Sequence, residues 1–248
     1  MSATTETAAK RSHRKRNLLI VAAIFGVMAI AGAGFGLWYI LIGPPSPAVA
    51  APVIPSGAQV PAPASLDGSW TVNAKLGSFT DFSSSWLGYR VREKFVNVGG
   101  HTAVGRTPKV TGSLTLNGST VTSATITGDL TALVSDASQR DGELGDSAIQ
   151  SNTFPTATFV LTSPIQLGSI PADGTTVSAT AVGDFTLHGV TRSVRLTIQA
   201  QKRGGIIAIS GSLPIVFADY DFKGPSVLGF VNVEDHGTME LHLLFTHS

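Results

Sequence analysis

The stretch that decides the fold runs from residue 183 to residue 194 and reads GDFTLHGVTRSV. On both sides of His188-Gly189, apolar residues alternate with polar ones; these apolar residues are Phe185, Leu187, Val190 and Val194. Alternation with a period of two is typical of a strand that has one buried and one exposed face. A glycine-containing pair tolerates the positive φ of a tight turn. The stretch therefore predicts a β-hairpin that turns at His188-Gly189.

The same period continues along most of the chain after residue 65. It extends the first hairpin to residues 177–198 and predicts a second one at residues 110–134, with a type I′ turn at Asn117-Gly118. Met239, Leu241, Leu243 and Phe245 mark the core face of a last strand. Many alternating strands without helical repeats leave a sandwich or a barrel as the main choices. Closure into a barrel removes exposed strand edges.

A different segment stands near the start of the chain. Residues 18–42 carry no charge, follow a basic tail at residues 1–17, and end near Trp38 and Tyr39. About 20 apolar residues span a bilayer, and basic residues stay on the cytoplasmic side. We expect a transmembrane signal-anchor helix at 18–42, with residues 1–17 cytoplasmic and the rest extracytoplasmic. The alternative is a signal peptide cleaved near Ala50, which would give a secreted protein.

The segment at residues 43–64 is rich in Pro and Ala and has almost no charge. Proline fixes φ and removes a backbone donor, so this composition predicts an extended linker between the membrane and the domain. The remaining residues, 65–248, are enough for one domain with its own core. The expected localisation is the cell membrane, with a single pass.

Composition excludes several functions. The chain has no cysteine, which removes disulfides, thiol catalysis and thiolate metal sites. Five of the 17 Lys and Arg residues precede residue 18, so the rest of the chain has a slight acidic excess. No basic stripe is present that would neutralise a nucleic-acid backbone.

Three sequence blocks carry a family resemblance. They read RDGEL at 140–144, FPTATF at 154–159 and GDFTLHGVTRSV at 183–194. Their order and spacing resemble the YceI-like family, whose blocks are Arg-Asp-x-x-Leu, aromatic-Pro-x-x-x-Phe and Gly-x-Leu-Thr-x-x-Gly-Val-Thr-x-x-Val. Phe185 stands where the last block usually has leucine, and Glu143 stands where the first often has histidine. The second departure bears on any head-group contact that depends on histidine.

The resemblance implies an all-β fold, namely an eight-stranded antiparallel lipocalin-like barrel. It also implies an apolar pocket for an isoprenoid lipid of the quinone or polyprenyl type, held for carriage, storage or shielding. The candidate lining residues are Tyr89, Val91, Phe95, Phe159, Phe185, Phe217, Tyr220 and Phe222. The family-motif residues expected to act structurally are Arg140, Asp141, Leu144, Pro155 and Gly189. For each aromatic, plain packing of the barrel interior is an equal alternative.

No enzymatic activity is expected, because the chain lacks the common nucleophile, metal and phosphate-loop motifs. No metal site is expected either. His101, His188, His236, His242 and His247 have no diagnostic spacing and are expected to be exposed. No cofactor is required, although a lipid or quinone could be bound. The other partner is the membrane, through residues 18–42, and a homodimer or a respiratory or envelope partner is left open.

The competing function is a structural or interaction barrel with no lipid ligand. Core and pocket use the same residue types, so the interior volume discriminates between the two. A cavity of several hundred cubic ångströms favours the carrier, whereas a filled interior favours the interaction barrel.

Overall fold

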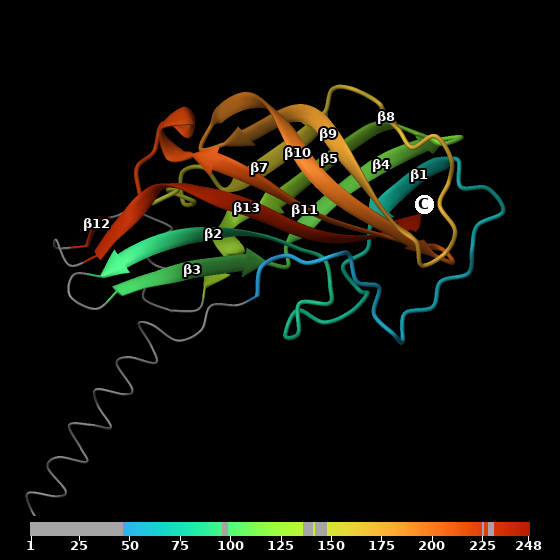
Figure 1. The fold of residues 1–248 in the computed structure, drawn as a ribbon, viewed down its shortest axis with the longest axis horizontal. Coiled ribbons are helices and arrows are strands. Elements are labelled where there is room, and N and C mark those ends of the chain that lie inside the picture. Colours follow the sequence, from blue (N-terminus) through green and yellow to red (C-terminus); the bar gives the residue numbers. More distant parts are fainter. Residues whose placement is uncertain (1–46, 96–98, 136–140, 142–147, 225, 228–230) are drawn as a thin grey trace, which may run out of the picture. The chain divides into compact units, whose positions relative to one another are not determined.

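The computed structural model describes residues 47–95, 99–135, 141, 148–224, 226–227 and 231–248. Figure 1 labels the strands, and η1 and η2 denote short 3₁₀ turns. In chain order the elements are β1 (Gly68–Val72), β2 (Trp86–Phe95), β3 (Gly99–Thr107), β4 (Val110–Asn117), β5 (Thr120–Asp129), η1 (Leu130–Ala132), β6 (Val134–Ser135), β7 (Thr156–Leu161), β8 (Ile165–Gln166), β9 (Thr176–Leu187), β10 (Val190–Arg203), β11 (Ile206–Val216), η2 (Phe217–Tyr220), β12 (Ser226–Val227) and β13 (Val231–His247).

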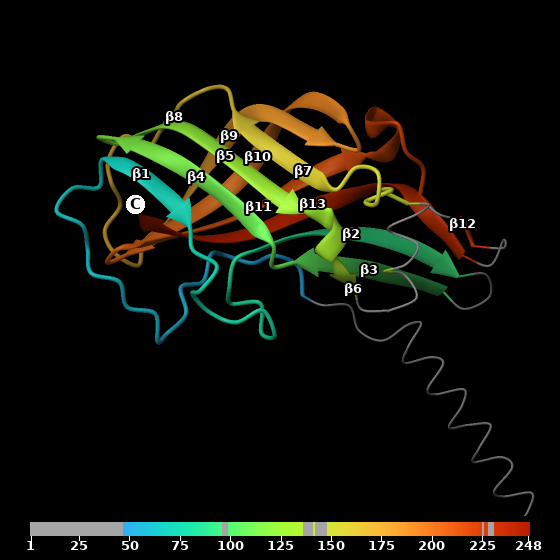
Figure 2. The ribbon, with the colours of Figure 1, turned by 180° about the vertical axis from the view of Figure 1, so that it is seen from behind.

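Eight strands form a closed antiparallel ring (Figures 1 and 2). Their order is β1, β4, β5, β7, β9, β10, β11 and β13. β13 closes the ring by pairing with β1, for example Trp70 with His247 and Val72 with Phe245. The predicted eight-stranded barrel is therefore confirmed.

The long last strand builds two different parts of the wall. One edge of β13 pairs with β11. The other edge pairs with β1 at the C-terminal end of the strand and with β2 along its earlier part. β3 and β6 continue the sheet beyond β2. The register of β2 against β13 shifts between Val233 and Gly237, which is a β-bulge. The sequence predicted only residues 239–245 of this strand.

The apolar side chains on the inward face of the strands fill the ring. Trp70, Leu187, Leu243 and Phe245 are almost completely buried in one cluster that takes side chains from all eight ring strands. The indole N–H of Trp70 donates to the Leu66 carbonyl at 2.9 Å, so this large side chain is buried without losing its hydrogen bond.

The two predicted turns differ in outcome. Leu187 pairs with Val190, and His188 and Gly189 have φ of 51° and 73°, so the first hairpin turns where predicted, with the positive φ at both positions of a type I′ turn. In the second hairpin, Asn117 pairs with Thr120, so the turn residues are Gly118 and Ser119. Of these two, only Gly118 has positive φ, which is the pattern of a type II′ turn, and the predicted Asn-Gly type I′ turn is wrong.

The described part of the predicted linker lies against the barrel. Ile54 is 6 % exposed and packs on Ile206, Ala208 and Leu244, on the outer face of β11 and β13. Gly205 donates its N–H to the Val60 carbonyl at 2.8 Å. We call residues 47–60 the strap, since they cover a second, external hydrophobic cluster.

The predicted transmembrane segment at 18–42 lies outside the described residues. In the part of the chain that the structure describes, no helix is long and apolar enough to cross a membrane.

Candidate functional site

The interior of the barrel contains an apolar cavity at the end where β2, β3 and η2 lie. Its walls include Tyr89 and Val91 of β2, Phe217 of η2 and Met239 of β13. Its volume is about 70 Å³, and the space free of atoms reaches about 770 Å³ when the open mouth is counted. The smaller value decides what fits without movement of the walls.

Two further cavities lie in the same interior. The middle one, about 30 Å³ by the same measure, is lined by Phe159, Phe185 and Met239 among others. The third, about 70 Å³, is lined by Leu114, Ile198 and other aliphatic residues. Met239 borders both the first and the second cavity. Because methionine is unbranched and flexible, a change of its side-chain rotamer can connect the two cavities.

Glycines in the strands allow aromatic rings to lie close to the wall. A Cβ added at Gly105 would be 2.4 Å from the Tyr89 ring, and one added at Gly183 would be 2.5 Å from the Phe159 ring. Real Cβ atoms do not approach that closely, so any side chain at these two positions would displace the ring. Both glycines therefore shape the interior, which explains their presence inside strands.

The structure places most candidate lining residues around these cavities. Tyr89, Val91, Phe217 and Phe222 line the first, and Phe159 and Phe185 line the second. Tyr220 is buried but lines neither of these cavities, and its ring packs edge-on against Phe185 with 5.8 Å between the centroids. The side chain of Phe95 lies outside the described part. That any of these residues contacts a lipid stays a prediction.

Two cavity-lining residues were not among the predicted ones, although the alternation of their strands marks them as inward-facing. Ile215 and Met239 line the first cavity and both have the inward parity of their strands. Leu130, Leu133 and Ala148 also line it, but they belong to η1 and to loops, where no period marks the buried positions.

The family-motif residues that are described have structural contacts. The Asp141 carboxylate accepts the Ser135 N–H at 2.8 Å, and its structural role stays a prediction. The Pro155 carbonyl accepts the Leu130 N–H at 2.8 Å. A Cβ at Gly189 would lie 2.9 Å from the Phe154 ring. Arg140, Glu143 and Leu144 lie outside the described residues.

The expectation that the histidines are exposed is wrong for two of them. His101 and His242 are buried, with 8 % and 4 % of their surface exposed. His188 is half-buried against the Phe154 and Phe222 rings and bonds to the Tyr220 carbonyl and Gln150. Among the described residues, no three His, Asp or Glu side chains are placed to hold a metal ion.

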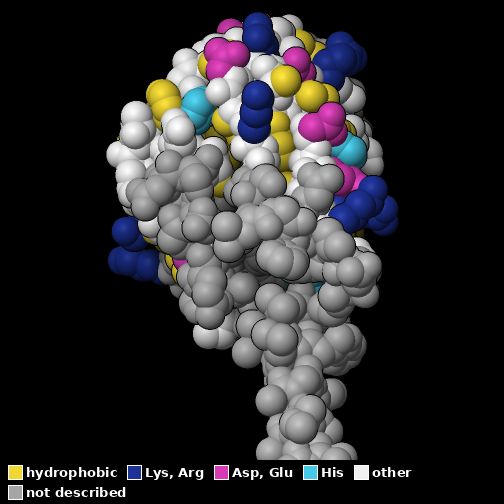
Figure 3. All heavy atoms as spheres, turned by 90° about the vertical axis from the view of Figure 1, so that its left-hand side faces the viewer, with side chains coloured by type: hydrophobic (Ala, Val, Ile, Leu, Met, Phe, Trp, Pro, Cys, Tyr) yellow, Lys and Arg dark blue, Asp and Glu magenta, His cyan; other side chains and the backbone are white. Residues whose placement is uncertain are grey.

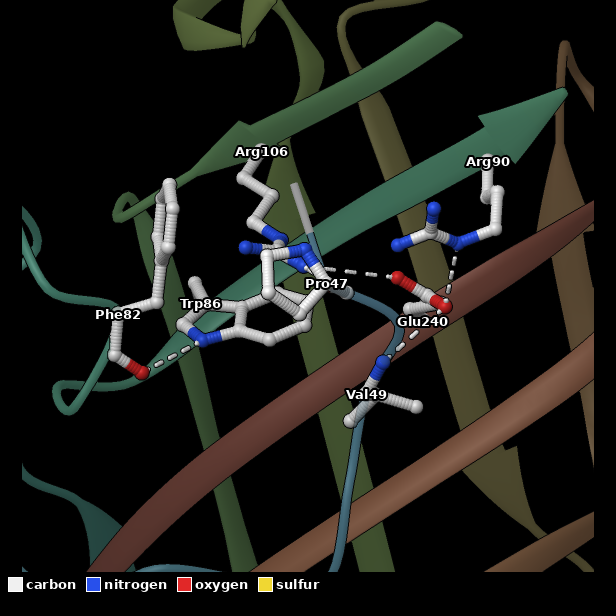
Figure 4. A network of polar contacts seen from close by, with 7 residues as sticks. All are labelled: Pro47, Val49, Phe82, Trp86, Arg90, Arg106 and Glu240. Carbon is white, nitrogen blue, oxygen red and sulfur yellow. Dashed lines mark hydrogen bonds and ion pairs between the residues drawn. The ribbon is translucent and has the colours of Figure 1, made fainter. Parts of the chain in front are cut away.

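A buried charge network lies on the outer face of the wall (Figure 4). Glu240 of β13 accepts a hydrogen bond from Arg90 Nε at 3.1 Å, and Arg106 of β3 is 3.8 Å from its other oxygen. The Arg106 guanidinium also lies 4.2 Å from the centroids of the Phe82 and Trp86 rings. Burial lowers the pKa of Arg106, and the charge of Glu240 opposes that shift.

The strap completes this network. The Pro47 carbonyl accepts a bond from Arg106 at 2.6 Å, and the Val49 N–H donates to Glu240 at 3.2 Å. Further along, the Val53 N–H lies 3.2 Å from Nε2 of His242. The charges are therefore desolvated by the strap, and the strap in turn is held by the charges.

A closed eight-stranded antiparallel barrel with an apolar interior defines the class of small barrels that can enclose one ligand. Within that class the chain can be placed in a family, because residues 70–245 match the YceI-like domain. The chain belongs to the YceI-like family.

Solved structures of low sequence identity resemble the barrel. A polyisoprenoid binding domain from Saccharophagus degradans has 17 % identity and a TM-score of 0.56, with 72 % of this chain and 98 % of that chain covered. Burkholderia cenocepacia BcnA has 21 % identity and a TM-score of 0.47, with 64 % and 95 % covered. Campylobacter jejuni YceI protein has 14 % identity and a TM-score of 0.47, with 58 % and 84 % covered. No curated protein matches the chain.

Proposed function

We propose that this protein binds a lipid with a polyisoprenoid chain, of the quinone or polyprenyl type, inside its barrel. The observation that carries the proposal is the series of interior cavities with almost wholly apolar walls. A polyisoprenoid carries no charge to recognise, and burial of its surface stabilises the complex by roughly 25 cal/mol per Å². The related domain from Saccharophagus degradans, which is described as polyisoprenoid binding, supports the same ligand class.

The small free volume favours a second candidate, an interaction barrel without a lipid. None of the three interior cavities described above reaches several hundred cubic ångströms by the measure that decides what fits. A bound lipid chain therefore requires side chains such as Met239 to move. We still place the lipid proposal first, because apolar cavities occur along the interior. A well-packed core that binds nothing would contain few such cavities.

We further propose that residues 18–42 anchor the protein in the cell membrane, with the barrel on the extracytoplasmic side. The uncharged segment, the basic tail before it and the aromatic residues at its end support this topology. The function is binding rather than catalysis, and carriage, storage and shielding are all consistent with it. Protease protection in sealed vesicles tests the topology, and an accessible N-terminal tail with a protected barrel in right-side-out vesicles would contradict it.

Filling the cavity tests the lipid proposal. Ala103 is 2 % exposed and lines the first cavity, so Ala103→Leu should remove most of its free volume. We expect the full chain to bind a polyisoprenoid quinone and this variant to bind it at least tenfold more weakly. Ala172→Leu, the same change at an exposed position, is the control. Equal binding by both variants, with both still folded by circular dichroism, would contradict an interior site.

A further inference from the structure

The barrel wall is split between β10 and β11 at the end where η2 lies. The ladder between these strands runs from Arg203 with Ile206 to Thr197 with Ser212 and stops there. β10 nevertheless continues back to Val190 on β9, and β11 continues to Val216 on β13. The two strands therefore separate without leaving their other partners, and η2, orange-red in Figure 1, follows directly after β11 at this end.

A groove lies on this split. It has a volume of about 690 Å³ and is open to solvent. Its walls come from residues 192–194 of β10, residues 214–216 of β11, Asp219 and Tyr220 of η2, and the bulge of β13. Ile215 and Gly237 line both this groove and the first interior cavity. These two residues therefore form part of the wall between the groove and the interior.

Arg192 has an unusual position in the groove. It pairs with Phe185, which is 5 % exposed and points inward, so Arg192 occupies a core-facing position of β10. Its side chain is nevertheless exposed, and its Nε donates to the Asp219 carbonyl at 2.8 Å. A guanidinium has five N–H donors and this bond uses one. The others can serve acceptor atoms of a ligand in the groove.

The charges around the groove favour a neutral ligand group. Asp219 shares the groove with Arg192, and His236 bonds Asp235 at 2.8 Å and lies 3.3 Å from Glu234. Figure 3 shows this end of the barrel, where side chains of both signs are mixed around hydrophobic ones in the described part. Acidic neighbours repel a phosphate, whereas a carbonyl or hydroxyl oxygen accepts hydrogen bonds from Arg192 without that penalty.

We propose that the groove between β10 and β11 binds the neutral, oxygen-bearing head group of the lipid through Arg192, while the chain passes beside Ile215 into the interior cavity. The inference rests on the proposed lipid binding and adds the location of the head group and the route of the chain. Beyond Thr197 and Ser212 no ladder joins β10 to β11. The wall can therefore widen there without breaking hydrogen bonds between these two strands.

Head-group binding is tested with a matched pair of arginines on β10. The full chain, in detergent, is titrated with a quinone that carries a polyisoprenoid tail. Loss of a charge-assisted hydrogen bond should make Arg192→Gln bind about tenfold more weakly. Arg195→Gln, an exposed arginine outside the groove, should bind as the unchanged chain does. A polyprenyl phosphate of the same tail length should bind more weakly than the quinone. Equal effects of the two substitutions, or tighter binding of the phosphate, would overturn the head-group assignment.

The route is tested by association rates with a matched pair of exposed valines. Val216 is 45 % exposed and lines the groove, whereas Val160 on β7 is 42 % exposed and lies outside it. Val216→Trp should slow quinone association at least fivefold, and Val160→Trp should leave it unchanged. Equal rates would overturn the route. If the unchanged chain binds no quinone, the proposed function itself fails, which is a different result from binding that ignores Arg192 and Val216.

Discussion

The carboxylate of Glu240, which is 3 % exposed, accepts the backbone N–H of Val49 at 3.2 Å, although the two residues are 191 positions apart. A residue from the predicted linker thus helps to satisfy a buried charge on the last strand. This contact makes the strap part of the folded domain, so a domain cut at residue 65 would expose both the network and the external hydrophobic cluster.

Removal of the buried negative charge should be strongly destabilising. Glu240→Gln leaves Arg90 and Arg106 without their shared carboxylate, and breaking such a pair costs about 3 kcal/mol. Glu234→Gln is the control, because its partners Lys94 and His236 are both exposed and surface pairs contribute about 1 kcal/mol or less. Urea unfolding of the full chain measures both. Equal losses would show that the network does not stabilise the fold.

The strap offers a second matched pair in two adjacent residues. Ile54 is 6 % exposed and Val53 is 54 % exposed. Truncation of a buried isoleucine costs about 2–5 kcal/mol, so Ile54→Ala should lower the free energy of unfolding by at least about 2 kcal/mol. Val53→Ala should change it by about 0.5 kcal/mol or less. Similar small effects would mean that the strap is not docked in solution.

Stability should fall in mild acid because of His242. Nδ1 donates to the Ser84 carbonyl, so in the neutral ring Nε2 accepts the Val53 N–H. Burial lowers the pKa of His242 below 6.5, while the Ser84 and Val53 carbonyls, which can accept from the protonated ring, act in the opposite direction. The unfolded chain then binds the proton more readily, so this contribution is present above pH 6.5 and is lost as the pH falls through the folded-state pKa.

The measurement is the melting temperature at pH 7.5 and pH 5.5. His242→Gln, which cannot be protonated, should lose less stability between the two pH values than the unchanged chain does. His236→Gln is the control, since His236 is 60 % exposed. Glu240 lies on the same face two residues away and is unchanged in all three proteins. An unchanged pH dependence in His242→Gln would refute the assignment.

Gly189→Ala should destabilise the hairpin formed by β9 and β10. The substitution places a Cβ at φ 73° and 2.9 Å from Phe154. Gly174→Ala is the control, because Gly174 has a φ of 80° but no atom near its Cβ position. Backbone strain of about 1–2 kcal/mol applies to both, so the additional loss in Gly189→Ala reports the contact with Phe154. Equal losses in thermal unfolding would show that this contact is relaxed at no cost.

The barrel could be predicted because its determinants are local. The alternation around His188-Gly189 reports a strand pair directly, and the inward parity marked Phe159 and Phe185 as interior residues. The turn after Asn117 was misassigned by one residue, because Asn117 still belongs to the strand and pairs with Thr120, and the sequence does not mark where that pairing ends.

The outer wall could not be predicted in the same way. Arg90, Glu240 and His242 occupy polar positions of their strands, and such positions normally face water. Here the strap and the loop that carries Phe82 cover them. Parity gives the face of a residue, but what covers that face depends on contacts with segments far away in sequence. The groove at Arg192 was missed for a related reason, because strand separation leaves no mark on the alternation.

The most direct test of the central claim is native mass spectrometry of the full chain, purified from its own cell type, followed by extraction and identification of any bound lipid. The account predicts one polyisoprenoid lipid per chain, and loss of that lipid from Ala103→Leu but not from Ala172→Leu. A folded chain that carries no lipid and binds no added quinone would contradict the account and favour an interaction barrel.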